Sequence, residues 1–232
     1  AVAFSPNGSI FASADSGNFI QLWYANSSKN NLKIKAHKGL FTGVNSLSFS
    51  PDSRIIASAG DDRTVKLWDV NTGSEIRTLK GHKRSVNSAA IDPNGKFIVS
   101  GSADKTAIIW DLDTGKILNV LNTNGKVNSV AFSPNGKIIA TGSDNYIIKL
   151  WKLSYGHNKI YTINSENWIK YGIYSRISVK CVTFSPNGEI LATSSDNNHI
   201  KLWDMNTKQE ICTLKGHSAK VNSMVFSPDG KT

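Results

Sequence analysis

The sequence predicts an all-β fold made of repeated four-stranded antiparallel sheets, and two ladders of residues lead to that prediction. Prolines that follow a serine or an aspartate stand at positions 6, 51, 93, 134, 186 and 228, so their spacings are 45, 42, 41, 52 and 42 residues. Tryptophans stand at positions 23, 68, 110, 151 and 203, with spacings of 45, 42, 41 and 52 residues. Because two independent markers share one period, the chain is an internal repeat.

Each repeat contains four short apolar segments that are separated by turn residues. In the third repeat we expect strands over 86–91, 97–101, 106–110 and 117–121. The first turn contains Pro93 and Gly95, because proline presets φ and glycine closes the turn. Helix-period patterns are absent, and four antiparallel strands of this length form one blade of a β-propeller.

The strand patterns also predict that the blades stack. Phe97, Ile98 and Val99 are consecutive apolar residues, so both faces of that sheet need cover, which neighbouring blades provide. The fourth strand over 75–79 alternates polar and apolar residues instead, which suits a solvated outer rim.

Short motifs make these repeats similar to those of the WD-40 repeat family. Gly81-His82 is followed 28 residues later by Trp110-Asp111, and the second motif recurs at Trp68-Asp69 and Trp203-Asp204. The resemblance spans essentially the whole chain, and the regular Ser-Pro-Asn/Asp-Gly turns are similar to those of bacterial members, which often sit beside signalling or ATPase domains.

The resemblance implies a partial ring. Rings in this family usually have about seven blades, whereas this chain accounts for five blades and the inner strand of a sixth, Val221 to Phe226. We therefore expect a fragment of a longer chain. The expected blades are 1–35, 44–80, 86–121, 127–164 and 179–215, with a partial blade over 221–232.

One set of side chains has the residue types of nucleophilic catalysis, a histidine, a serine and an aspartate. However, a serine or threonine stands ten residues before every repeat tryptophan, and an active site is seldom copied into every blade. The resemblance implies instead a structural chain of hydrogen bonds that satisfies buried polar groups. We expect two copies: His37, Ser58, Asp62 and Trp68, and His82, Ser100, Asp104 and Trp110.

Other repeats depart from this pattern. The fourth has Thr123-Asn124 in place of Gly-His and Asn145 at the aspartate position, the fifth lacks the histidine and has Asn197, and the first has Gly17. We expect these blades to be less tightly held and more mobile. The departures are either sequence drift or marks of binding positions.

Other chemistry is not indicated by the sequence. Cys181 and Cys212 fall on apolar strand positions and are expected to be reduced thiols. The five histidines have no metal-ligand spacing and the glycine-rich stretches are strand or turn elements, so no metal and no cofactor is expected. No run approaches the ~18 apolar residues of a membrane helix. We expect a cytoplasmic protein that is not an enzyme.

The loops before successive inner strands predict a binding rim, which relatives of this type use most for peptides. Its cations would attract acidic or phosphorylated segments, arginine through bidentate contacts and lysine as a point charge, or each is simply a solvated loop residue. Asp61, Asp144 and Asp196 on the same rim dilute the positive field. The candidates are Lys38, Lys83, Arg84, Lys126, Lys180 and Lys220.

The spacing of 52 residues places an insertion near 164–178, between the fourth and fifth blades. It contains Trp168, Tyr171 and Tyr174, aromatic types that make interface hot spots. The alternative is that they fold back over the blade edge as a satellite core. Phe41, in a smaller extension of the second blade, poses the same question.

Together these patterns predict a non-catalytic scaffold or sensing module that binds other proteins through its loops. The net charge of +10 keeps association with nucleic acid as an alternative, although the lysines form no single basic stripe. A third alternative is a regulatory module of an enzyme encoded in missing parts of the chain.

Overall fold

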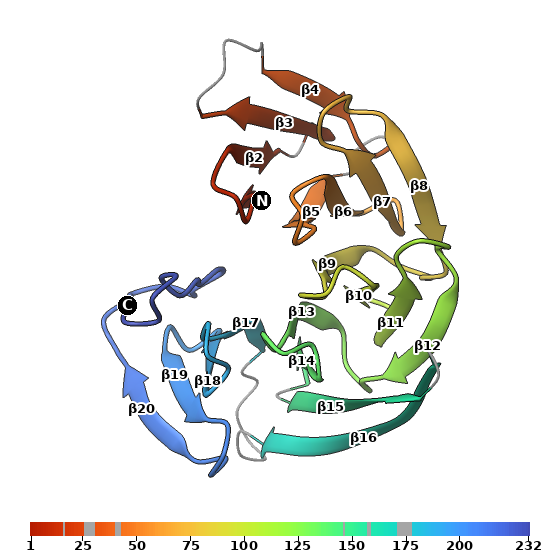
Figure 1. The fold of residues 1–232 in the computed structure, drawn as a ribbon. Helices are drawn as coiled ribbons and strands as arrows, with labels where there is room; N and C mark the ends of the chain where they lie inside the picture. Colours follow the sequence, from red (N-terminus) through yellow and green to blue (C-terminus); the bar gives the residue numbers. More distant parts are fainter. Residues whose placement is uncertain (16, 26–30, 40–42, 146, 157–158, 171–177) are drawn as a thin grey trace. The chain divides into compact units, whose positions relative to one another are not determined.

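The chain folds into five four-stranded antiparallel sheets in the computed structural model (Figure 1). The structure describes residues 1–15, 17–25, 31–39, 43–145, 147–156, 159–170 and 178–232, with the backbone alone for 154–156 and 159–170. Within these ranges there is no helix long and apolar enough to cross a membrane. The predicted fold class, all-β with four-stranded antiparallel blades, is confirmed.

The chain divides into two compact units, Ala1–Leu121 and Asn122–Thr232, which are described separately. Three sheets belong to the first unit, and in each the strands lie side by side in chain order. The strands are β1 (Val2–Phe4), β2 (Ile10–Ala14), β3 (Phe19–Tyr24), β4 (Leu32–Lys35), β5 (Val44–Phe49), β6 (Ile55–Gly60), β7 (Thr64–Asp69), β8 (Glu75–Lys80), β9 (Val86–Ile91), β10 (Phe97–Ser102), β11 (Thr106–Asp111) and β12 (Ile117–Asn122).

The turn between the first two strands of each blade is built by side chains as well as by proline. In the second blade, Ser50 Oγ donates to Asp52 Oδ1 at 2.6 Å and accepts the Ile55 amide at 2.9 Å. In the third blade Asp92 replaces the serine, and its Oδ1 accepts the amides of Lys96 and Phe97 at 2.6 and 2.7 Å. The same turn therefore forms with either residue, because both supply an acceptor for the amides at the start of the second strand.

The second and third blades pack face to face through a continuous apolar cluster. It includes Leu67 and Leu79 from the second blade and Val86, Ile98 and Trp110 from the third. Every residue of β10 is buried, as the consecutive apolar pattern predicts. Stacking therefore covers the sheet faces that one blade alone would expose.

Polar side chains also link neighbouring inner strands, a contact that the sequence analysis did not foresee. Asn45 Nδ2 donates to the Val86 carbonyl at 3.0 Å, and the Ile91 amide donates to Ser48 Oγ at 3.1 Å. In the second unit Asn128 Nδ2 donates to the Val179 carbonyl at 2.8 Å. A sign of these contacts was present in the sequence, because the tripeptide Val-Asn-Ser begins four of the segments expected to form inner strands.

The second unit contains two complete sheets, again with strands in chain order. Their strands are β13 (Val127–Phe132), β14 (Ile138–Ser143), β15 (Ile147–Gly156), β16 (Lys159–Lys170), β17 (Val179–Phe184), β18 (Ile190–Ser195), β19 (Ile200–Asp204) and β20 (Glu210–Leu214).

The fourth blade differs from the prediction in its outer strands. We expected the blade to end near 164 and an insertion to follow, but β16 runs to Lys170 and pairs with β15 along its length, from Gly156↔Lys159 to Ile147↔Lys170. Much of the extra length therefore extends a pair of antiparallel strands. Backbone pairing explains the difference, because β15 supplies an antiparallel neighbour for the extra residues of β16.

The predicted inner strand over Val221–Phe226 is the second difference. This segment is not paired as a strand in the structure. Its Val221 carbonyl accepts a hydrogen bond from Ser194 Oγ at 2.8 Å. Every complete inner strand pairs with the second strand of its own blade, and the described residues offer no such neighbour to this segment, so a ladder does not form.

Candidate functional site

The third blade brings together His82, Ser100, Asp104 and Trp110. His82 lies in the loop before β9, Ser100 on β10, Asp104 in the turn after β10, and Trp110 on β11. His82 Nδ1 lies 2.9 Å from Asp104 Oδ2 and Nε2 lies 2.8 Å from Ser100 Oγ. Trp110 Nε1 donates to Ser100 Oγ at 2.8 Å. All four predicted residues thus join in one hydrogen-bonded chain.

The direction of these hydrogen bonds follows from the chemistry of the partners. An ionised carboxylate can only accept hydrogen bonds, so His82 Nδ1 carries a proton and donates a hydrogen bond to Asp104. Burial lowers the pKa of His82, which keeps the imidazole neutral, so Nε2 accepts from the Ser100 hydroxyl. Ser100 is fully buried, and its oxygen donates to His82 while it accepts from Trp110. This hydroxyl group therefore has both a hydrogen-bond acceptor and a hydrogen-bond donor as partners inside the blade.

Asp104 is held in its ionised form by the loop around it. Burial alone would raise the pKa of this carboxyl, but hydrogen bonds from Thr106, from the Lys83 amide and from His82 lower it. Thr106 Oγ1 donates to Oδ1 at 2.6 Å and the Lys83 amide donates to Oδ2 at 2.8 Å. The carboxylate therefore ties the loop before β9 to the start of β11.

The second blade repeats this arrangement with His37, Ser58, Asp62 and Trp68. His37 Nδ1 lies 2.8 Å from Asp62 Oδ1 and Nε2 lies 2.8 Å from Ser58 Oγ, to which Trp68 Nε1 donates at 2.9 Å. Burial opposes ionisation of Asp62, but hydrogen bonds from His37 and Thr64 outweigh it and lower its pKa to about 2.

In the other three blades, the described residues form the tryptophan end of this hydrogen-bonded chain. Indole nitrogens of Trp23, Trp151 and Trp203 donate to Ser13, Thr141 and Thr193 at 3.1, 3.0 and 2.9 Å. This bond needs only two adjacent strands of one blade, whereas the histidine and the aspartate come from separate loops.

The fourth blade shows what replaces the missing histidine. Thr123 is buried and donates to the Gly125 carbonyl at 2.7 Å, while Asn124 is exposed with a φ of 62°. Asn145 Nδ2 donates to the Thr123 carbonyl at 3.3 Å. Its Oδ1 is buried and accepts no hydrogen bond within the described ranges. This loop is therefore built differently, with one polar atom left unsatisfied.

The predicted rim cations are mostly exposed. In the first unit Lys38, Lys83 and Arg84 are exposed, and in the second unit Lys126 and Lys220 are exposed. Lys180 is half-buried, and its Nζ pairs with Asp196 Oδ1 at 3.2 Å, so its charge is partly neutralised.

Some predicted aromatic residues cannot be placed at a site. Phe41, Tyr171 and Tyr174 lie outside the described residues, and Trp168 lies on β16 where the backbone alone is described. The question of whether they bind or pack therefore stays a prediction.

Rim carboxylates hold the backbone of the loops that carry the cations, a role that the sequence analysis missed. The amides of Lys38 and Lys83 donate to Asp62 and Asp104, and the Lys126 amide donates to Asp144 Oδ1 at 2.7 Å. In the third blade Ser102 Oγ also donates to the Arg84 carbonyl at 3.1 Å. The loop backbone is thus fixed, while the charged ends of Lys83 and Arg84 stay in solvent.

Two pockets lie elsewhere. One, of about 500 Å³ in the first unit, is lined by Asp15, Asp61, Asn45 and neighbouring backbone. Asp61 is already engaged, because it accepts from the Gly43 amide and from Asn45 Nδ2. The acidic residues here make the rim of the first two blades mixed in charge.

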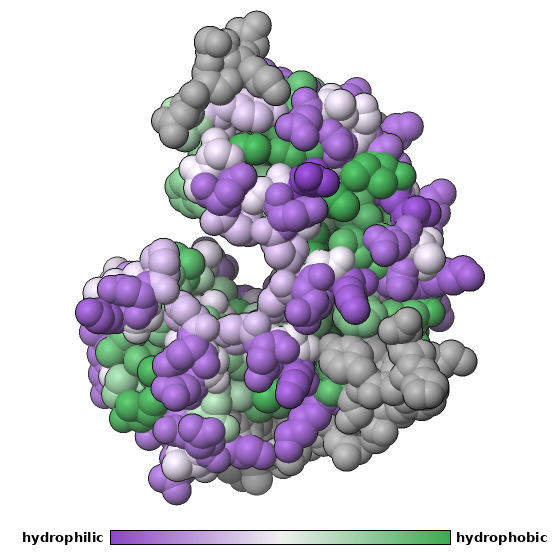
Figure 2. Space-filling model, in the orientation of Figure 1, coloured by the Kyte–Doolittle hydropathy of each residue, from purple (hydrophilic) through white to green (hydrophobic). Residues whose placement is uncertain are grey.

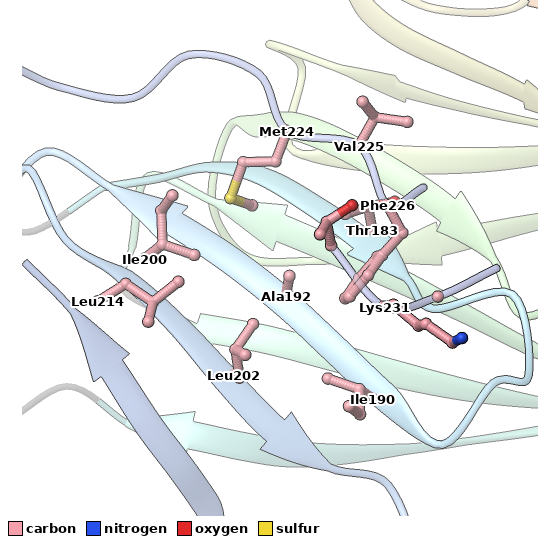
Figure 3. A pocket seen from close by; sticks show the side chains of 12 residues that line it. Thr183, Ile190, Ala192, Ile200, Leu202, Leu214, Met224, Val225, Phe226 and Lys231 are labelled. Carbon is pink, nitrogen blue, oxygen red and sulfur yellow. The ribbon is translucent and has the colours of Figure 1, made fainter. Parts of the chain in front are cut away.

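The other pocket, of about 380 Å³, lies in the second unit between the last sheet and the C-terminal segment (Figure 3). Figure 3 shows Ile200, Leu202 and Leu214 on the strands facing Met224 of that segment. The matching positions of the second blade, Val65, Leu67 and Leu79, pack against the third blade. This surface is therefore a face for packing blades and offers few polar groups to orient a ligand.

Comparison with known families agrees with this architecture. A family model described as WD domain, G-beta repeat matches six segments. The matched residues are 1–24, 28–69, 73–111, 115–152, 173–204 and 208–232. Members of this family generally act as protein-interaction scaffolds.

Curated relatives are similar over short stretches. A periodic tryptophan protein 2 homolog of Neurospora crassa is 35% identical over 69 residues, 29% of this chain and 8% of the relative. An uncharacterized WD repeat-containing protein of Nostoc sp. is 39% identical over 57 residues, 24% of this chain and 4% of the relative. The nuclear distribution protein PAC1-2 of Postia placenta is 38% identical over 53 residues, 23% and 12% of the two chains. The chain thus matches only a small part of these relatives' length.

Proposed function

This chain belongs to the WD domain, G-beta repeat family, and from that premise we propose that it is a non-catalytic scaffold whose rim loops bind acidic or phosphorylated segments of other proteins. The main contacts are Lys83 and Arg84 in the loop before β9.

The observation that carries the proposal is the fixed backbone beneath two exposed cations. Asp104 accepts the Lys83 amide and Ser102 donates to the Arg84 carbonyl, so the loop is held on both sides. A held loop loses little conformational freedom on binding, which favours affinity. Arginine offers a planar fork for carboxylate or phosphate, and the neighbouring lysine adds a point charge.

The geometry of the histidine, serine and aspartate supports a structural role over a catalytic one. A nucleophile must reach its substrate, but Ser100 is fully buried and its hydroxyl is already shared between His82 and Trp110. The same four-residue chain occurs in two blades of the first unit, which suits a repeated framework.

The proposal is tested by fluorescence anisotropy with two serine-containing acidic peptides that differ only in phosphorylation of the serine. Lys83→Glu/Arg84→Glu is compared with the parent and with Lys96→Glu/Lys116→Glu. Lys96 and Lys116 are exposed at the opposite end of the same blade, so this control changes net charge equally. We expect binding to weaken at least about tenfold in the rim variant only, a loss of about 1.4 kcal/mol.

Two results would count against the proposal. Equal weakening in both variants would mean that net charge, and not the rim, attracts the peptide. Binding of a random-sequence oligonucleotide in preference to both peptides, released by salt, would favour nucleic-acid association instead.

A further inference from the structure

A polar cluster covers the repeat tryptophan in two blades. In the second blade, Lys66 Nζ pairs with Glu75 Oε2 at 2.5 Å and lies 5.5 Å from the centre of the Trp68 ring, while Thr78 donates to Glu75. In the fifth blade Lys201, Glu210 and Thr213 make the same contacts beside Trp203, with Lys201 Nζ 5.4 Å from the ring. Lysine, glutamate and threonine stand two residues before, seven after and ten after the tryptophan.

The third blade has apolar residues at all three positions. Ile108, Ile117 and Val120 stand two before, seven after and ten after Trp110. Ile108 is buried, but Ile117 is 46% exposed and Val120 is 54% exposed. Leu118 between them is also exposed. Figure 2 shows hydrophobic surface among hydrophilic residues over the region of β8 and β12. At these three positions the third blade is therefore apolar where the second and fifth blades have lysine, glutamate and threonine, although β8 and β20 expose apolar residues elsewhere.

The strand that carries these residues is also an edge strand. The sheet order β12-β11-β10-β9 places β12 at the outer edge, where alternate backbone N–H and C=O groups point away from the sheet. Natural edge strands are usually protected by charged side chains. The outer strand β8 contains Glu75, Arg77 and Lys80, whereas β12 contains no charged residue over Ile117–Asn122. Within the described residues, β12 therefore has no charged side chain of its own to protect this edge.

We propose that β12 is a docking strand that pairs with an extended segment of another protein by β-strand addition. Main-chain hydrogen bonds to the open edge would supply affinity, and apolar residues at alternate positions of the partner would cover Ile117 and Val120. The docking strand is separate from the loop before β9, so this inference does not depend on the rim proposal.

Charge indicates which partner fits this edge. Two copies of a chain with net charge +10 repel each other, which disfavours pairing of β12 with β12 of a second copy. Close to the strand the charges are mixed, because the exposed Lys116 stands directly before it and the exposed Asp113 three residues earlier, so the net charge of +10 decides the attraction. The fitting occupant is therefore a segment of alternating apolar residues flanked by acidic ones.

The probe is a short fluorescent peptide of alternating valine and threonine with glutamates at both ends, measured by anisotropy. The test variant is Ile117→Glu/Val120→Thr, which places the glutamate and threonine of the second blade on β12. The control is Ile76→Thr, which removes an exposed apolar residue from the charged strand β8. A version of the peptide with N-methyl groups at alternate amides tests for backbone pairing.

We expect the parent and Ile76→Thr to bind the peptide, and Ile117→Glu/Val120→Thr to bind at least about tenfold more weakly. The N-methylated peptide should lose binding to the same extent. Circular dichroism checks folding, and Leu118→Lys replaces the double variant should that one not fold. No binding by the parent, equal binding of the N-methylated peptide, or dimerisation of the chain through β12 that excludes the peptide would each overturn the proposal.

Discussion

In both the third and the fourth blade the repeat tryptophan donates to a hydroxyl group, Trp110 to Ser100 at 2.8 Å and Trp151 to Thr141 at 3.0 Å. The two blades differ in the further partners of that hydroxyl group. In the third blade His82 and Asp104 continue the chain of hydrogen bonds to the rim loop. In the fourth, the loop turns at Asn124, and Asn145 Oδ1 accepts no hydrogen bond from the described residues. The tryptophan bond therefore holds two strands of one blade together, whereas the histidine and the aspartate connect the blade to its rim loop.

Removing the histidine of the third blade should lower the free energy of unfolding more than any other change. His82→Ala leaves Ser100 and Asp104 without their buried partner, so we expect a loss of about 3 kcal/mol in the free energy of unfolding. Urea denaturation measures the loss. Asn124→Gly changes the matching position of the fourth loop, which is exposed and has a φ of 62° that glycine adopts freely, so the stability should change by less than about 0.5 kcal/mol. Equal losses in the two variants would contradict the distinction between the blades.

Removing the hydroxyl group should give the next largest effect and again separate the blades. Ser100→Ala leaves two buried groups unpaired, His82 Nε2 and Trp110 Nε1, and we expect a loss of about 2 kcal/mol. Thr141→Val leaves mainly the indole nitrogen of Trp151 unpaired, so about 1 kcal/mol is expected. Urea midpoints measure both losses, and their ratio shows how much more stability the hydroxyl group contributes where a histidine lies behind it. A greater loss in Thr141→Val would refute it.

Acid should destabilise the intact blades through a smaller effect that depends on pH. The pKa of His82 is lowered in the folded state from 6.5, so the unfolded chain binds the proton first and stability falls as the pH drops below about 6.5. The pKa of Asp62 is lowered from 3.8 to about 2, so a further loss follows between these values. Urea midpoints measured against pH should show the upper loss in the parent but not in His82→Gln. An unchanged upper step in His82→Gln would show that another group titrates there.

The strands and the two hydrogen-bonded chains could be predicted because their signals are local and repeated. A proline turn, a tryptophan and a serine or threonine ten residues before it recur in each repeat, and antiparallel pairing of neighbouring strands then brings Ser100 beside Trp110. The side chains that link inner strands, such as Asn45 and Ser48, were missed because their partners belong to the next blade. In the sequence, such small polar residues within a strand look like ordinary solvated residues.

Two other features could not be predicted from the repeat. The extended β16 was interpreted as an insertion because spacing reports the number of residues and not whether they pair. The missing ladder at Val221–Phe226 depends on a neighbouring strand, which a motif within the segment cannot indicate. The apolar edge of β12 was missed because spacing alone does not show that Lys66 and Glu75 contact each other beside Trp68, and that contact identifies the positions at which the third blade is apolar.

The central claim is that Asp104 holds the rim loop in place so that Lys83 and Arg84 can act as contacts. Amide hydrogen exchange at Lys83 tests it most directly, because this amide donates to Asp104 Oδ2. We predict slow exchange in the parent and in Arg84→Glu, and exchange at least about tenfold faster in Asp104→Ala, corresponding to about 1.4 kcal/mol of lost protection. Equal exchange at Lys83 in the parent and in Asp104→Ala would contradict the claim.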